Sequence, residues 1–497
     1  MTIVLRLTSH GHRVILSSCL DGICAPTSTR PMPVFILGTH RSYQIMVQSD
    51  QMNRREFMQR SALGGAAMGA ALTESSAGTA DPLRPVPAGD KITVGMIGVG
   101  ARAQQLMDAL FELPNVEIVS LCDAYTGRVE RTLERTDRKP KVAKDYREIL
   151  ADKSVDTVVI ATPDHWHSRM VIDAVRAGKD VYIEKPLTYT IDEGVAIIDE
   201  VRKSGRILQV GSQGIATRVQ QKAREIIASG RLGQITMIRA QFNRNTADGA
   251  WIYPIPPDAS PKTVDWEMFL GPAPRRPIDY PRFFRWRCYQ DYSGGMSTDL
   301  FVHLVTSIHF MMNAKMAGKV VAMGELYRWK ESRDVPDTIN AILEYPEGFV
   351  ASLSGTFNNQ YGSESGFQIL GTKGSLIVGD TLAFYPEIVN QDNRWIVDSW
   401  PSAMEKAYYE NPKVRAEEMP STREPEVLLG SEQYREVGLD STVVHMRNFF
   451  SCVKTRQQPV EDALAGHRAA SCAHLVNASL REQKIVHWDF DRDLMKA

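Results

Sequence analysis

The sequence has few cysteines and no excess of charge of either sign. Its 6 cysteines form no Cys-x-x-Cys pair and no zinc-finger spacing, so neither a disulfide framework nor a metal knuckle is indicated. The 58 lysines and arginines balance 59 aspartates and glutamates, which removes the basic excess that nucleic-acid binding needs. Internal repeats and low-complexity tracts are also missing. We therefore expect a globular protein that binds small molecules and no nucleic acid.

Long hydrophobic runs are absent too, but a short one follows an arginine pair near the N-terminus. The segment "MNRREFMQRSALGGAAMGAAL" begins at Met52 and carries Arg54 and Arg55 before the apolar stretch 61–72. This stretch is shorter than the about 20 residues that a transmembrane helix requires. Paired arginines before a short apolar run are typical of a twin-arginine export signal. A chance arginine pair beside an Ala/Gly-rich linker is the weaker alternative.

The export interpretation divides the N-terminal region. We expect residues 1–51 to be an upstream extension without a fold and residues 52–90 to be the signal peptide and a linker. The small residues at 77–80 suit cleavage, and the sequence leaves open whether the signal is removed. The protein would then use the twin-arginine (Tat) export machinery and lie in the periplasm or the cell envelope.

From residue 91 onward, short apolar runs alternate with amphipathic helical patterns. The runs include "KITVGMIGVG", "VEIVSLCDA", "VDTVVIAT" and "DVYIEK", all rich in β-branched residues. Continuous apolar strands alternating with helices are typical of a parallel sheet covered on both faces. We predict an α/β fold whose residues 91–213 form a doubly wound Rossmann domain.

From residue 214 the strands become longer and alternate between apolar and polar residues. The segments "DTINAILEYPEGFVASLSGTF" and "GFQILGTKGSLIVGDTLAFYP" predict antiparallel hairpins. Two helices, over about 441–455 and 461–481, are expected to pack on this sheet, and the polar region 395–440 to be a surface excursion. We predict an α+β domain over 214–497 with a large, mostly antiparallel sheet, which as an open sheet allows a homo-oligomer.

A glycine turn follows the first predicted strand. In "TVGMIGVGARAQ", Gly98 and Gly100 precede a helix, and Ala103 takes the third glycine position of G-x-G-x-x-G. Glycine allows the tight turn and lets a pyrophosphate approach the N-terminus of the helix. A plain strand-to-helix turn would show the same short pattern, so the motif depends on its context.

That context is a carboxylate at the end of the second strand. Asp123 lies near the separation of about 20 residues at which a ribose-binding carboxylate is expected. Such a group accepts a hydrogen bond from the 2′-hydroxyl and repels a 2′-phosphate. NAD is therefore favoured over NADP as cofactor, with Arg102 and Arg128 as the residues that would reverse this preference.

Two further strands end in polar motifs at the same sheet edge. "ATPDHWH" carries Thr162, Pro163 and His167, and "DVYIEK" ends in Glu184 and Lys185. Ligands of doubly wound folds bind at this edge, so these residues are predicted to face the cofactor, although the first motif also suits a helix start. A lysine there can stabilise the alkoxide that precedes hydride loss. The two histidines of the first motif lack a third ligand, so no metal site is predicted.

The order of these motifs resembles a known family. G-x-G-x-x-A, the acidic strand end, T-P-x-x-x-H and E-K-P resemble the Gfo/Idh/MocA oxidoreductases, two-domain enzymes that act on sugars and polyols. The segments "WIYPIPPDASPKTVDWEMFLGPAP" and "GHRAASCAHLVNA" are similar to an often exported bacterial branch. The resemblance covers nearly all of the chain from residue 91 onward. The cofactor-binding residues expected from motifs and resemblance together are Gly98, Val99, Gly100, Ala101, Arg102, Asp123, Thr162, Pro163, His167, Glu184 and Lys185.

A helical pattern in the second domain carries the D-x-x-x-H of the family. Asp299 and His303 are four residues apart and hence on one face of the predicted helix. The resemblance implies that His303 is the general base for the hydroxyl proton, that Asp299 holds it, and that Lys185 completes the catalytic set. A hydrogen-bonded helical pair without chemistry is the alternative, and His309 is expected only to pack.

Aromatic residues are dense in "YPRFFRWRCYQDYSGG", which favours core packing over substrate stacking. Trp166 and Tyr292 are the two candidates for substrate contact.

These observations predict an NAD-dependent oxidoreductase that moves hydride between a tightly held cofactor and a sugar, polyol or glycoside carbon. Tight binding is expected because nicotinamide is scarce outside the cytoplasm. One alternative is an NAD-dependent glycosidase or lyase that oxidises a sugar transiently, although D-x-x-x-H departs from the H-G-x-G pattern associated with the glycosidase branch. Another is a non-catalytic sugar- or nucleotide-binding protein, against which the retained Lys185 and His303 argue.

Overall fold

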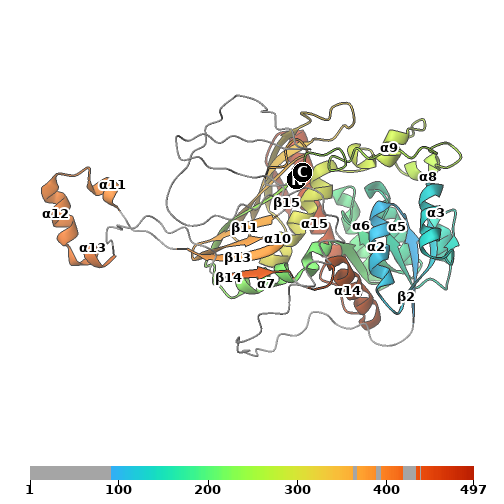
Figure 1. The fold of residues 1–497 in the computed structure, drawn as a ribbon, viewed down its shortest axis with the longest axis horizontal. Helices are drawn as coiled ribbons and strands as arrows, with labels where there is room; N and C mark the ends of the chain where they lie inside the picture. The colour runs from blue at the N-terminus through green and yellow to red at the C-terminus, as the bar shows by residue number, and fades with distance from the viewer. Residues whose placement is uncertain (1–90, 362–365, 388–392, 418–431, 437, 497) are drawn as a thin grey trace, which may run out of the picture. The chain divides into compact units, whose positions relative to one another are not determined.

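The computed structural model describes residues 91–361, 366–387, 393–417, 432–436 and 438–496 (Figure 1). All of these belong to one unit of the chain, Ala80–Ala497. The predicted extension 1–51 and the predicted signal and linker 52–90 lie outside the described residues.

The N-terminal part of the described chain is a parallel sheet of six strands in the order β3-β2-β1-β4-β5-β6. Its central strands β4 and β5 are mostly apolar and are buried along their whole length, as the continuous runs predict. The order reverses between β1 and β4, which opens a crevice at their carboxyl ends. The strands are β1 Ile92–Ile97, β2 Val116–Cys122, β3 Lys141–Val142, β4 Thr157–Ile160, β5 Asp180–Glu184 and β6 Leu208–Gly211. The helices between them are α2 Ala101–Phe111, α3 Thr126–Arg135, α4 Tyr146–Ala151, α5 His167–Arg176 and α6 Ile191–Ser204.

The C-terminal part contains, within the described residues, a sheet of ten strands in the order β14-β13-β12-β11-β7-β10-β9-β8-β15-β16. Neighbouring strands are antiparallel except β7 and β10. The strands are β7 Ile235–Asn243, β8 Lys319–Glu325, β9 Thr338–Tyr345, β10 Phe349–Thr356, β11 Gly366–Gly371, β12 Gly374–Val378, β13 Thr381–Pro386, β14 Glu432–Arg435, β15 Val486–Asp489 and β16 Leu494–Met495. The predicted fold class is confirmed.

One face of this sheet forms the core of the second domain. Alternate side chains of β9 are buried, because its sequence alternates between apolar and polar residues. They pack in one hydrophobic cluster with α7 Arg218–Ala228, α10 Val302–Met312 and α15 Ala463–Glu482. The short helices α8 Trp266–Leu270 and α9 Tyr280–Phe284 precede α10 in the chain.

The helix α14 Ser441–Thr455 has the predicted bounds but not the predicted position. Its apolar side chains pack on the Rossmann domain, where the ring of Phe449 lies 5.6 Å from that of Tyr182. The prediction that both late helices cover the second sheet was therefore wrong for α14 and right for α15. A chain segment far beyond residue 213 thus completes the covering of the first sheet (Figure 1).

The region 395–440, predicted to be a surface excursion, contains regular elements. Its described residues include α11 Arg394–Val397, α12 Ser402–Glu410 and α13 Pro412–Glu417. The strand β14 extends the large sheet by pairing with β13.

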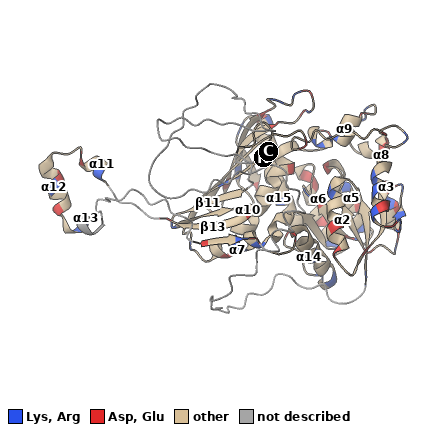
Figure 2. Ribbon diagram, viewed as in Figure 1, with Lys and Arg blue, Asp and Glu red and all other residues tan. Residues whose placement is uncertain are grey.

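Residues of both charge signs alternate along α3. In Figure 2, blue basic residues and red acidic residues follow one another along the ribbon of this helix. This helix therefore presents no block of a single sign, in keeping with the balanced composition. Among the described helices, none combines the length and the apolar character needed to traverse a lipid bilayer.

Candidate active site

A cavity of about 810 Å³ runs along the carboxyl ends of β1, β2, β4 and β5. Side chains of the C-terminal domain, among them Phe283, Trp286, Arg287 and His303, form its other wall. The predicted cofactor residues that line it are Gly98, Gly100, Ala101, Arg102, Asp123, Thr162, Pro163, Glu184 and Lys185. Val99 and His167 are buried and do not line it.

The glycine turn has the geometry that a dinucleotide requires. Gly98 has a φ of +79°, and a Cβ added there would lie 2.8 Å from the carbonyl oxygen of Ala161. Both the backbone conformation and the close approach therefore demand glycine. Gly100 precedes α2 and supplies no side chain to its first turn, so the N–H groups of that turn are open to a phosphate. The chain thus fits the pyrophosphate of NAD at this position.

Asp123 holds the glycine turn as well as facing the cavity. Its Oδ2 accepts a hydrogen bond from the N–H of Val99 at 2.8 Å, and its Oδ1 accepts one from the N–H of Tyr125 at 2.9 Å. Val99 was predicted to bind the cofactor. Instead its backbone N–H binds Asp123, and its side chain does not line the cavity. Arg128 lies 3.5 Å from Oδ1 and 5.5 Å from the ring centre of Phe283. This guanidinium is already engaged, which weakens its role as a 2′-phosphate ligand.

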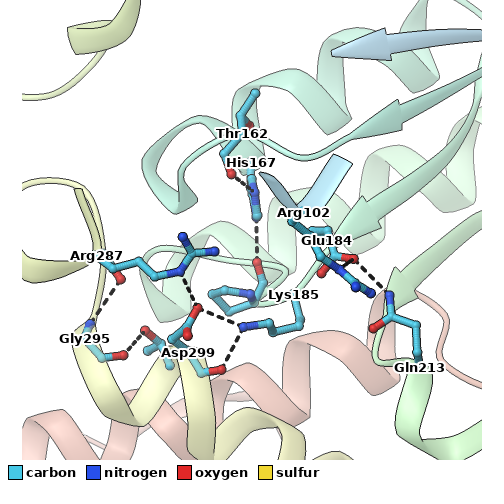
Figure 3. A network of polar contacts seen from close by, with 12 residues as sticks. Arg102, Thr162, His167, Glu184, Lys185, Gln213, Arg287, Gly295 and Asp299 are labelled. Carbon is cyan, nitrogen blue, oxygen red and sulfur yellow. Dashed lines mark hydrogen bonds and ion pairs between the residues drawn. The ribbon is translucent and has the colours of Figure 1, made fainter. Parts of the chain in front are cut away.

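His167 joins two of the loops that border the cavity. Its ring nitrogens lie 2.7 Å from the carbonyl oxygen of Pro186 and 2.9 Å from that of Thr162 (Figure 3). Burial lowers the pKa of the imidazole. His167 was predicted to bind the cofactor. This prediction is corrected, because both ring nitrogens contact backbone oxygens and connect the T-P turn to the E-K-P turn.

Glu184 is the centre of a small network beside the cavity. Its Oε1 accepts hydrogen bonds from Nε of Arg102 and Nε2 of Gln213, each at 2.9 Å (Figure 3). The positive charge of Arg102 is therefore paired within the protein, which leaves it little capacity to attract a 2′-phosphate.

Lys185 is held by the second domain. Its Nζ donates to Oδ1 of Asp299 at 2.8 Å and to the backbone oxygen of the same residue at 2.7 Å. Nε of Arg287 donates to the same Oδ1 at 2.9 Å (Figure 3). Burial alone would raise the pKa of Asp299, but the Lys185 and Arg287 charges hold it well below its usual range. Asp299 is thus a carboxylate shared by two cations.

The segment that carries Asp299 is not the predicted α-helix. Ser297–Phe301 forms a π-helical turn that leads into α10. The hydrogen bonds of the Asp299 carboxylate go to Lys185 and Arg287, and none of them joins it to His303. A π-helical turn holds more residues than an α-helical turn, so the four-residue spacing no longer implies that both side chains lie on one face. Asp299 therefore positions Lys185, which corrects the prediction that it holds His303.

His303 lines the cavity near Lys185. Burial and the Lys185 charge lower the pKa of its imidazole to about 3. The ring is therefore neutral at physiological pH and can accept a hydrogen bond from a hydroxyl group. His309, in contrast, is half-buried and lies 3.1 Å from the hydroxyl of the core residue Tyr345, in keeping with its predicted packing role.

The two aromatic candidates have different positions. Trp166 lines the cavity and donates from Nε1 to the carbonyl oxygen of Phe269 at 3.0 Å. Tyr292 is 0% exposed, and its ring centre lies 4.8 Å from that of Phe269 and 5.2 Å from that of His165. Its prediction as a substrate residue is wrong, because the dense aromatic stretch folds into a core cluster.

The structure adds residues that the motifs did not indicate. Arg287 and Gln213 both line the cavity, but neither belongs to a local pattern that would single it out. Asp164 is buried behind the site with an Oδ2 that has no hydrogen-bond partner. Burial and the Asp299 charge raise its pKa to about 7.

A segment of the second domain closes over the cofactor loops. Residues 258–271, termed here the strap, bind next to Asp123 through an antiparallel bridge of Tyr125 with Val264. The hydroxyl of Tyr125 also donates to Oδ1 of Asp258 at 2.5 Å. At its other end, the strap carbonyl of Phe269 contacts the motif that follows β4. The strap thus joins both loops on which the nucleotide would rest.

A Rossmann sheet with a glycine turn, an acidic strand end and a buried lysine at the crevice defines a dinucleotide-dependent oxidoreductase. Residues 92–212 match the family model described as "Oxidoreductase family, NAD-binding Rossmann fold", and residues 272–377 match the GFO/IDH/MocA C-terminal domain. The chain therefore belongs to the Gfo/Idh/MocA oxidoreductases, as its motifs indicate. The predictions of the family, of an NAD-dependent oxidoreductase and of NAD as cofactor are confirmed.

Relatives share this fold and parts of the sequence. The scyllo-inositol 2-dehydrogenase (NAD(+)) of Bacillus subtilis (strain 168) is 23% identical over 269 residues, which cover 54% of this chain and 67% of the relative. The alpha-N-acetylgalactosaminidase of Shewanella oneidensis is 34% identical over 126 residues, 24% of this chain and 28% of the relative. A levoglucosan dehydrogenase in complex with NADH and levoglucosan has a TM-score of 0.59 at 18% identity, covering 80% of this chain and 99% of that structure.

Proposed function

We propose that the protein transfers hydride between NAD and a carbinol carbon of a sugar, polyol or glycoside. The observation that carries this proposal is the position of Lys185, which extends from the nucleotide-binding sheet and is held by Asp299 of the second domain. His303 lines the same cavity. A proton-accepting ring and an ammonium group on one cavity are the pair that alcohol oxidation requires.

Each residue has a defined part in this scheme. NAD, when bound, supplies the ring that takes up or releases the hydride. Nζ of Lys185 donates a hydrogen bond to the reacting oxygen and stabilises its negative charge. The neutral imidazole of His303 accepts the hydroxyl proton at a ring nitrogen. Asp299 fixes Lys185 and is itself fixed by Arg287.

We also propose that the cofactor stays bound between turnovers. The strap supports this, because it is bonded to the loop after β2 and to the loop after β4 at the same time. Release of the nucleotide would have to break one of these attachments. Retention also suits export by the twin-arginine route to the periplasm or cell envelope, where free nicotinamide is scarce.

A homo-oligomer through the large sheet is part of the same proposal. On the face of this sheet opposite the core, Val321 of β8 pairs with Ile342 of β9, and these side chains are 36% and 51% exposed. Neighbouring Met323 is 79% exposed. An apolar strip of this kind on a sheet face supports contact with a second copy.

A redox-neutral glycosidase or lyase is the second candidate. The sequence likeness to alpha-N-acetylgalactosaminidase favours it, and a retained cofactor would permit oxidation and re-reduction within one cycle.

The test is to purify the exported protein, denature it, and identify the released nucleotide. The native protein is then incubated with a panel of sugars, polyols and glycosides while the nicotinamide absorbance is followed. We expect NAD or NADH in the released fraction and an absorbance change with at least one carbinol. Glycoside cleavage without net oxidation would select the second candidate, and no conversion of any compound would contradict both.

A further inference from the structure

We infer that the substrate of this site carries a carboxylate and that Arg287 binds it. This inference deepens the proposed function, since it concerns the substrate class of the same cavity. It starts from the charges at the reacting end, where the cations outnumber the anions.

The local charge count is positive. Lys185 and Arg287 share the single carboxylate of Asp299. The charge of Arg102 is cancelled by Glu184, and the imidazole of His303 is neutral. One positive charge therefore has no counter-ion beside the reacting lysine, apart from the buried Asp164. Because burial and the Asp299 charge raise the pKa of Asp164 to about 7, that carboxyl group is only partly ionised at neutral pH and offsets only part of this charge.

Arg287 is the positively charged side chain that can contact a ligand in the cavity. Its Nε is used by Asp299, whereas Nη1 and Nη2 have no hydrogen-bond partner among the described residues. Figure 3 shows these two nitrogens on the side of the guanidinium away from Asp299. Arg287 lines the cavity, so its outer edge is open to a bound molecule.

The guanidinium is also held in a fixed orientation. It stacks over the ring of Trp286, with the guanidinium carbon 4.2 Å from the ring centre, and Asp299 anchors its inner edge. A planar, fixed pair of N–H groups matches the two oxygens of a carboxylate. A neutral hydroxyl could accept only one of these bonds and would leave the charge without a counter-ion once water is expelled.

The chemical class follows from this geometry. Arg287 and Lys185 bind the same Asp299 oxygen, so the carboxylate would lie within the same small molecule as the reacting carbinol. Uronic acids and aldonic acids combine these two groups. We therefore expect acidic sugars to bind better than their neutral counterparts.

The test measures binding to the NAD-loaded full chain by calorimetry with matched probes. The pairs are D-glucuronate with D-glucose, D-galacturonate with D-galactose, and D-gluconate with D-glucitol. We expect at least one acid to bind about tenfold or more tightly than its neutral partner, as a charge-assisted hydrogen-bond pair provides. The inference is overturned if no acid binds more tightly than its partner.

Variants assign the preference to Arg287. Arg287→Met should abolish it, and Arg287→Lys, which keeps the charge but loses the paired donors, should retain only part of it. Arg276→Met is the matched control, because Arg276 pairs with Asp291 away from the cavity lining, and it should behave as the wild type. NAD affinity and the melting temperature check that each variant is folded. An acid preference that persists in Arg287→Met would also overturn the inference.

Turnover separates this inference from the proposed function. Preferential binding of acids without conversion of any carbinol would contradict the proposed function and leave the inference standing. Conversion of neutral sugars with no acid preference would do the reverse.

Discussion

Nζ of Lys185 lies 2.8 Å from the carboxylate of Asp299, a residue that follows it by 114 positions in the chain. The contact joins the end of β5 to the π-helical turn before α10. The orientation of the lysine therefore depends on both domains.

Replacing Lys185 by alanine should lower kcat by about 100-fold to 10,000-fold, the range expected for loss of a positioned proton donor. NAD affinity should change little, because the glycine turn and Asp123 remain. Steady-state kinetics and a fluorescence titration with NADH measure the two quantities. Lys203→Ala is the control, since Lys203 forms an exposed ion pair with Glu200. Turnover equal to that of the wild type would remove Lys185 from the mechanism.

The pH profile should show no titration of His303 near neutrality. Burial and the Lys185 charge lower the pKa of this imidazole to about 3, so it loses its proton well below the pH range of most assays. His303→Gln should therefore reduce kcat by a similar factor at every pH from about 5 to 8, the range in which an ordinary histidine titrates. A wild-type inflection near pH 6.5 that disappears in the variant would contradict this assignment.

Tyr125→Phe should accelerate release of the nucleotide. The substitution removes the hydrogen bond of the hydroxyl to Asp258 and so weakens one attachment of the strap. A loss of about 1 kcal/mol corresponds to a release rate about fivefold faster. Stopped-flow displacement of NADH measures this rate. Tyr189→Phe, which loses a hydrogen bond to the carbonyl oxygen of Gln290, serves as the control, and equal rates in both variants would argue against the strap.

Glu461→Gln should make stability less sensitive to pH. Burial raises the pKa of Glu461 to about 8 from an ordinary value of 4.5, and its Oε2 has no hydrogen-bond partner. A raised folded-state pKa means that the stability contribution is complete below pH 4.5 and is lost as the pH rises towards 8.

The expected slope for one proton is at most about 1.4 kcal/mol per pH unit. Denaturant unfolding of both proteins at several pH values gives the difference. Asp164, whose pKa is also raised, titrates in both proteins and cancels in this comparison. Parallel curves over this range would show that Glu461 is already ionised in the folded protein.

The local patterns predicted much of this protein. Apolar runs without alternation indicated β4 and β5, because a strand buried on both faces has apolar residues at successive positions. Strict alternation indicated β9, because a strand buried on one face has apolar residues at every second position. Gly98 could be assigned to the turn from the G-x-G-x-x-A motif that follows the first strand, and the structure gives it a φ of +79°, which suits glycine. The order of the motifs then indicated the family and NAD.

Contacts between distant segments could not be predicted in this way. The spacing of Asp299 and His303 suggested a shared helix face, but a π-helical turn and two cations direct the carboxylate to Lys185. The positions of Tyr292 and α14 could not be predicted either, because each depends on the distant surface against which it packs in the folded chain.

Local patterns along the chain were enough to predict the two sheets, the nucleotide turn and the residues that can carry a proton, because periodicity and backbone preference act over a few neighbours. Which charges meet became visible only in the folded chain, since Lys185, Arg287 and Asp299 come from separate segments and pair in a shared, poorly solvated space. For the same reason, the strap and the open edge of Arg287 could be recognised only after folding had placed them beside the cavity.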